Sequence, residues 1–142
     1  MKFSEGTLWD YPVAAGAVIN VGAAVIANAS GYATQASAPA ENQVILGIAT
    51  ESVDNTGGAN GAVRITVLKR GIVDATIVGG IAQAQVGKPA YLDGYDAANQ
   101  RPKVHGAQTS GGGGGGQSTN RTALGTVVSV EGSVARIQLT TV

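Results

Sequence analysis

The segment VRITV, residues 63 to 67, alternates apolar and polar side chains, and residues 134 to 139, VARIQL, do so again around Ile137. Alternation with a period of two is typical of a β-strand with one buried face, because successive side chains point to opposite sides of a sheet. Both segments are therefore predicted to be strands that bury their apolar side chains in a core.

The remaining apolar segments have the same character. They are short, rich in Ala, Val and Ile, and bounded by Gly, Asn or Ser: Ala17–Ile26, Ala62–Leu68, Gly71–Val78 and Thr126–Val130. The one helical candidate, Ala14 to Ala29, contains Gly16, Gly22 and several β-branched residues, which disfavour a helix. We expect an all-β fold, either a small β-barrel or a jelly-roll-like sandwich, with eight or more strands.

Three short motifs recur in the same order along the chain. The motif Val21-Gly22 returns as Val86-Gly87, Leu46-Gly47 as Leu124-Gly125, and Arg64-Ile65-Thr66-Val67 as Arg136-Ile137-Gln138-Leu139. The offsets of 65, 78 and 72 positions imply that the second copy gains 13 residues and then loses six. The gain is assigned to the glycine run, and the loss to a tight turn near Glu131 that replaces the longer Asp54–Asn60 connection. Two related halves explain this pattern; chance similarity among small residues is the alternative.

One domain is expected for residues 1–142, with an amino-terminal arm over residues 1–12 and a flexible loop over residues 106–120. That loop contains six consecutive glycines, Gly111 to Gly116. A phosphate-binding loop would need a lysine and a following helix, and neither pattern is present. The glycines are interpreted as a lengthened, mobile connection that folding does not require.

Composition argues against several classes of partner. Nine basic and nine acidic residues give a net charge of zero without clusters, so we expect no nucleic-acid or membrane partner. No apolar run approaches the ~18 residues of a membrane span, and the amino terminus lacks a signal-peptide pattern. Cysteine is absent, which excludes disulfides, thiolate nucleophiles and Cys-ligated zinc.

Residues that could carry chemistry are few. His105 is the single histidine, and no carboxylate lies near it in the sequence. Asp93 and Asp96 are interpreted as a polar turn that follows a strand ending at Leu92. No serine has the Gly-x-Ser-x-Gly context of a hydrolase nucleophile. We expect no catalytic, metal or cofactor site, and no enzymatic activity.

The order of the short pieces resembles the capsid cement, or head decoration, proteins of tailed bacteriophages. The matching pieces span nearly the whole chain: Ala14-Ala15-Gly16-Ala17-Val18, Val21-Gly22-x-x-Val25, Leu46-Gly47-Ile48-Ala49, Gly71-Ile72-Val73, Val86-Gly87-x-x-Ala90-Tyr91-Leu92-Asp93, and Leu124-Gly125 with Val134 to Leu139. The polyglycine insertion and the aromatic segment Leu8-Trp9-Asp10-Tyr11 depart from the family pattern.

The resemblance implies a compact β-barrel or jelly-roll-like protein without enzymatic activity or cofactor. It implies a structural virion protein that is made in the host cytoplasm and stabilises the capsid exterior. Its expected partners are the major capsid protein and further copies of itself, as a dimer or trimer. The alternative is a binding module on the same virion surface, such as a head-fibre or carbohydrate-binding domain.

The candidate interface with the capsid or a neighbouring subunit lies near the amino terminus, at Phe3, Leu8, Trp9 and Tyr11. Three of the six aromatic residues of the chain lie in this polar segment, and large rings commonly anchor interfaces. A second interpretation is that Leu8 to Val13 is the first strand and that Trp9 plugs one end of its own barrel.

Overall fold

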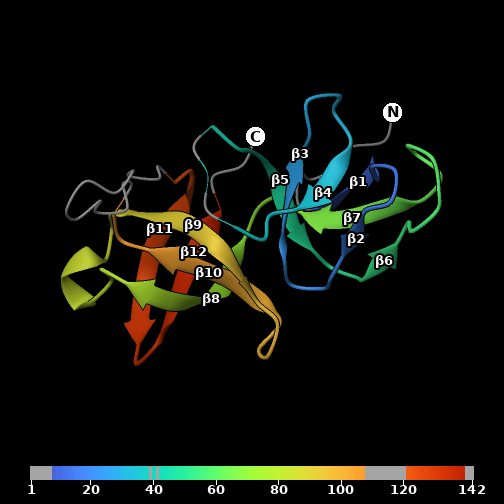
Figure 1. Ribbon diagram of the computed structural model, residues 1–142. Coiled ribbons are helices and arrows are strands. Elements are labelled where there is room, and N and C mark those ends of the chain that lie inside the picture. The colour runs from blue at the N-terminus through green and yellow to red at the C-terminus, as the bar shows by residue number, and fades with distance from the viewer. Residues whose placement is uncertain (1–7, 39, 41, 108–120, 140–142) are drawn as a thin grey trace, which may run out of the picture.

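The computed structural model describes residues 8–38, 40, 42–107 and 121–139 and is almost entirely β-structure. It contains twelve strands and one short 3-10 helix in these residues, which confirms the all-β prediction. The strands form two lobes that lie side by side, the N-terminal lobe of residues 8–68 and the C-terminal lobe of residues 72–139 (Figure 1).

The N-terminal lobe is a five-stranded sheet with the order β1-β7-β5-β3-β4. Its strands are β1 (Leu8–Pro12), β3 (Ala24–Ala27), β4 (Ala33–Gln35), β5 (Val44–Ala49) and β7 (Arg64–Leu68). A parallel bridge from Val13 to Ala33 brings the chain after β1 against β4, so the sheet curls toward closure. Two further strands, β2 (Val18–Ile19) and β6 (Val53–Asp54), pair with each other. The Asp54–Asn60 connection is therefore more than a hairpin turn, because Asp54 belongs to β6 and this strand pairs with β2.

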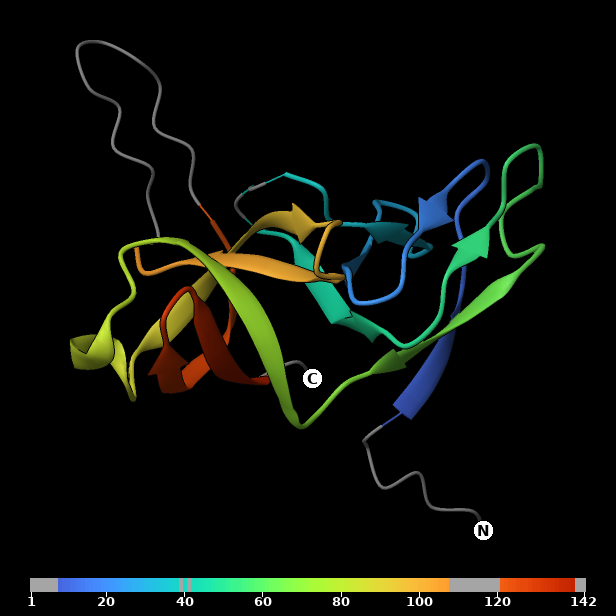
Figure 2. The same ribbon diagram turned by 90° about the horizontal axis from the view of Figure 1, so that it is seen from below.

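The C-terminal lobe is a closed five-stranded barrel with the order β10-β8-β12-β11-β9. Its strands are β8 (Ile72–Gly79), β9 (Pro89–Asp96), β10 (Arg101–His105), β11 (Ala123–Glu131) and β12 (Val134–Leu139), with the 3-10 helix η1 (Gln83–Gln85) before β9. The barrel closes through a parallel pairing of β8 with β10. Figure 2 shows the same two lobes from below.

The two lobes share one topology. When β1, β7, β5, β3 and β4 are matched with β8, β12, β11, β9 and β10, the strand order is the same in both. The register also agrees, because Val25 opposes Gly47 as Ala90 opposes Gly125, and each pair of strands has a bulge just after these residues. The parallel contact between the first and last of the matched strands recurs as well, from the residue after β1 to β4 and from β8 to β10. The internal repeat predicted from the sequence thus corresponds to a repeated fold.

Equivalent glycines occupy equivalent backbone positions. Gly22 and Gly87 have φ of 84° and 87°, in the left-handed region that favours glycine. Their N–H groups donate over 2.8 Å to the carbonyl oxygens of Ala49 and Val127, which also correspond to each other. The recurrence of the Val-Gly motif therefore reflects a turn that both lobes require before β3 and β9.

The structure corrects two details of the repeat. Val67 opposes Ala49 and Ile137 opposes Val127, so Val67 corresponds to Ile137 rather than to Leu139. The sequence comparison was two residues out of register, a shift that keeps every side chain on its proper face and so preserves the apparent match. The gain of 13 residues is also divided: six lie in the β9–β10 hairpin, and seven lie in the connection that holds the glycine run.

Two apolar clusters form the core. One fills the N-terminal lobe with Val13, Ile19, Val25, Ala33, Ala49, Ile65 and Val67. The other fills the barrel with residues of β8 to β12 and also contains Ala24, Ala36 and Ile48 from the N-terminal lobe. The inner face of the first sheet thus packs in the core of its own lobe, and its outer face packs against the barrel.

The longer β9–β10 hairpin connects the lobes. The Tyr95 hydroxyl donates a 2.7 Å hydrogen bond to the carbonyl of Val21, and the carbonyl of Gln100 lies directly against Gly22. A Cβ on Gly22 would lie 1.7 Å from that oxygen, so only glycine allows this approach. The extra residues of this hairpin therefore add polar and close-packed contacts to the apolar cluster that joins the lobes.

Candidate functional site

The predicted interface residues Leu8, Trp9 and Tyr11 all lie on β1, whereas Phe3 lies outside the described residues. Strand β1 pairs with β7 over its whole length, from Leu8 opposite Leu68 to Pro12 opposite Arg64. Residues 8–12 are thus the first strand of the N-terminal lobe, and the prediction that they belong to a separate arm is wrong.

Trp9 lies at one end of the N-terminal lobe on the side of the sheet that faces the core. It opposes the fully buried Val67, and cross-strand partners share a face. Even so, 50% of Trp9 is exposed, and its neighbour Leu8 is 52% exposed. Trp9 therefore occupies the end position expected of a plug but leaves half of its surface accessible to a partner.

Tyr11 is held in place by Lys69. The Lys69 ammonium lies 4.9 Å from the centre of the Tyr11 ring, donates to its hydroxyl, and donates over 3.2 Å to the carbonyl of Leu46. Tyr11 also packs against the core of the N-terminal lobe. Of the three described candidates, Tyr11 is accordingly a structural residue, and Leu8 and Trp9 present the accessible apolar surface.

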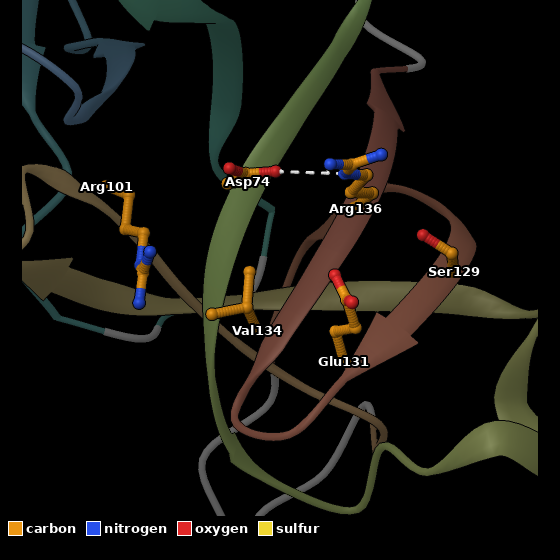
Figure 3. A pocket seen from close by; sticks show the side chains of 6 residues that line it. All are labelled: Asp74, Arg101, Ser129, Glu131, Val134 and Arg136. Atoms are coloured by element: carbon orange, nitrogen blue, oxygen red, sulfur yellow. Dashed lines mark ion pairs between the residues drawn. The ribbon is translucent and has the colours of Figure 1, made fainter.

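A polar hollow of about 490 Å³ lies on the C-terminal lobe (Figure 3). It is lined by Asp74, Arg101, Ser129, Glu131, Val134 and Arg136. Asp74 and Arg136 point toward each other from neighbouring strands, with 3.5 Å between the Arg136 Nε and the carboxylate, and both are more than half exposed. Two positive and two negative side chains therefore balance each other around this hollow.

Beside the hollow, Thr76 organises a small hydrogen-bond network. Its hydroxyl donates over 2.5 Å to Asp96 and accepts a 2.7 Å bond from the Nε of Arg101. The Thr76 hydroxyl, and after it the Asn99 side chain, lower the pKa of Asp96 to about 2. A carboxylate that is ionised at neutral pH accepts hydrogen bonds well but is a weak general base there.

The polar residues singled out in the sequence have structural roles. Asp93 and Asp96 lie inside β9, so the prediction of a turn after Leu92 is wrong. Asp93 instead forms a 2.9 Å ion pair with Arg121, and both side chains are about nine-tenths buried. His105 accepts a 2.9 Å hydrogen bond from the backbone N–H of Ala107.

Arg121 was not recognised as important from the sequence. Besides its bond to Asp93, it donates a 3.0 Å hydrogen bond from Nη1 to the carbonyl of Ala107. Ala107 and Arg121 are the described residues on either side of the 108–120 segment. This arginine therefore ties both ends of that connection to β9, an arrangement that no local sequence motif indicates.

Within the described ranges, no three His, Cys, Asp or Glu side chains gather as metal ligands would. None of the helical structure in the described residues is long and apolar enough to span a membrane. Comparisons with protein-family models, curated proteins and solved structures find no match for this chain. The accessible surface of β1 and the balanced polar hollow are the features from which a function can be argued.

Proposed function

We propose that this protein is a structural virion protein that binds the outer surface of a tailed-bacteriophage capsid and stabilises the shell. In this proposal it acts by binding alone, without catalysis or cofactor, and its partners are the major capsid protein and further copies of itself. The family resemblance of the ordered sequence motifs is the origin of the proposal.

The observation that carries the proposal is the accessible apolar surface of Leu8 and Trp9 on a fully paired strand. Both side chains are about half exposed, although the strand that holds them pairs along its length with β7. A rigid strand loses little conformational entropy on binding, and exposed tryptophan is a common interface anchor. A surface of this kind suits a protein that contributes binding energy to a shell, through the capsid protein or through a neighbouring copy.

The repeated arrangement of cement proteins on a capsid adds to this argument. An oligomer that contacts the capsid through several copies needs only a modest affinity at each contact, because loss of one contact leaves the others in place. The zero net charge agrees with a contact that rests on apolar packing more than on long-range electrostatic attraction.

The proposal is tested by mixing the purified chain with capsids of the same phage that lack it. We expect saturable co-sedimentation and an increase in the temperature at which the capsids open. Trp9→Ser should weaken binding at least about tenfold if Trp9 is an anchor. Val44→Ser, which alters another exposed apolar side chain of the N-terminal lobe, is the control and should bind normally.

Absence of binding by the wild-type chain would refute the proposal. Binding to host-cell glycans without binding to capsids would favour the alternative of a carbohydrate-binding module. In that case Trp9→Ser should abolish glycan binding, since sugar rings stack on exposed aromatic side chains.

A further inference from the structure

The open end of the barrel in the C-terminal lobe is covered by the N-terminal lobe. Ala24 and Ile48, on the outer face of β3 and β5, are buried in the same cluster as the barrel interior. Val73 of β8 packs against this cluster and lines, with Ile48 and Gly22, a hollow of about 340 Å³ between the lobes. The first sheet therefore acts as a partial lid over Val73, which is partly buried.

The repeat identifies the equivalent position in the N-terminal lobe. Val73 opposes Ile137 as Trp9 opposes Val67, and Val67 corresponds to Ile137, so Trp9 is the counterpart of Val73. Leu8 and Ile72, one residue earlier, also correspond, and both are exposed. The end of the N-terminal lobe thus presents a half-exposed tryptophan at the position that corresponds to Val73, which the first sheet covers in the C-terminal lobe.

The C-terminal lobe has its own equivalent of the outer face of β3 and β5, namely the outer face of β9 and β11. Ala24, Ile26 and Ile48 correspond to Pro89, Tyr91 and Thr126. These three residues are uncharged, and each is exposed or partly exposed. Proline and tyrosine offer flat apolar surface on which an indole ring can pack.

We propose that the end of the N-terminal lobe of one copy packs on the outer face of β9 and β11 in a second copy, with Trp9 placed against Thr126, Pro89 and Tyr91. The contact would reproduce between chains the packing that joins the two lobes within a chain. It uses two different surfaces, so it is a head-to-tail contact that forms a ring when the rotation closes. The proposed contact rests on the self-association stated under the proposed function and names its surfaces. It is tested without capsids, so its outcome is independent of capsid binding.

The absence of cysteine allows a direct test with the full chain. One preparation carries Trp9→Cys and a second carries Thr126→Cys; they are mixed under mild oxidation and separated without reductant. We expect a disulfide-linked dimer that contains one chain of each variant. Pairing Val18→Cys with Thr126→Cys is the matched control, because Val18 is also exposed on the N-terminal lobe but lies outside the proposed contact.

A second measurement avoids dependence on Trp9. Sedimentation velocity should show wild-type oligomers, and Thr126→Arg should weaken association at least about tenfold, as a central interface residue would. Val44→Arg, on another exposed surface, should associate as the wild type does.

Three results would overturn the inference. A wild-type chain that remains monomeric at high micromolar concentration would do so, as would a Trp9→Cys preparation that links only to itself. The third is a Thr126→Cys thiol that does not react with a maleimide at a dilution where the chain is monomeric, since that surface would then be covered within one molecule.

Discussion

Gly22 and Gly87 provide a matched pair of sites at which to measure the packing between the lobes. They occupy the same position in the two copies of the repeat and have nearly the same φ. A Cβ on Gly22 would lie 1.7 Å from the Gln100 carbonyl oxygen, whereas a Cβ on Gly87 would have no atom within 4 Å. Alanine therefore imposes the same backbone strain at both positions, but it produces a steric clash only at Gly22.

The expected losses follow from these distances. Left-handed backbone costs an alanine about 1–2 kcal/mol relative to glycine, so Gly87→Ala should lower the free energy of unfolding by that amount. Gly22→Ala incurs the same strain, and moving the hairpin at Gln100 away from the new methyl group adds about 1–3 kcal/mol, the usual range for overpacking. Gly22→Ala should thus be less stable than Gly87→Ala by at least about 1 kcal/mol.

Urea denaturation followed by tryptophan fluorescence and by circular dichroism measures both variants, with the wild type as reference. Equal losses for Gly22→Ala and Gly87→Ala would refute the reasoning, because they would show that the β9–β10 hairpin does not fix the lobes. Hydrogen exchange gives an independent result: amides of this hairpin should lose protection in Gly22→Ala and keep it in Gly87→Ala.

Three further predictions concern ionisable side chains. Arg121→Ala leaves a buried carboxylate without its partner and should cost about 3–5 kcal/mol in urea denaturation, whereas Arg136→Ala removes an exposed ion pair and should cost less than about 1 kcal/mol; similar values would contradict the assigned burial. The pKa of Asp96 is lowered to about 2 from 3.8, so the stability it contributes is present above pH 3.8 and is lost as the pH falls toward 2. In thermal unfolding, the stability of Asp96→Asn should fall less steeply with decreasing pH over this range than that of the wild type. An unchanged dependence of stability on pH would show that the hydrogen bonds of Asp96 do not contribute to stability. Tyr95→Phe removes the hydrogen bond to Val21 and should cost about 1 kcal/mol at pH 7. Because burial raises the pKa of Tyr95 above 10.0, the difference between Tyr95→Phe and wild type should persist below pH 10 and diminish only as the pH rises through that raised pKa.

The sequence by itself determined the all-β class of the fold and the existence of the repeat. The period of two around Ile65 and Ile137 specifies strands with one buried face, because side chains alternate strictly along a strand. The Val-Gly motif recurs because both lobes need a left-handed turn at Gly22 and Gly87, and that backbone conformation is a local property. These features depend on residues that are close together in the chain.

The partners of each side chain were decided only by the tertiary structure. Asp93 looked like part of a turn, and it became a strand residue because Arg121, far along the chain, neutralises its charge inside the protein. Trp9 was equally compatible with a core or an interface, and its half exposure follows from the absence, among the described residues, of a lid like the one that covers Val73. Contacts of this kind join distant segments, and the free energy of burying or exposing a side chain depends on all the surfaces that meet around it rather than on its neighbours in sequence.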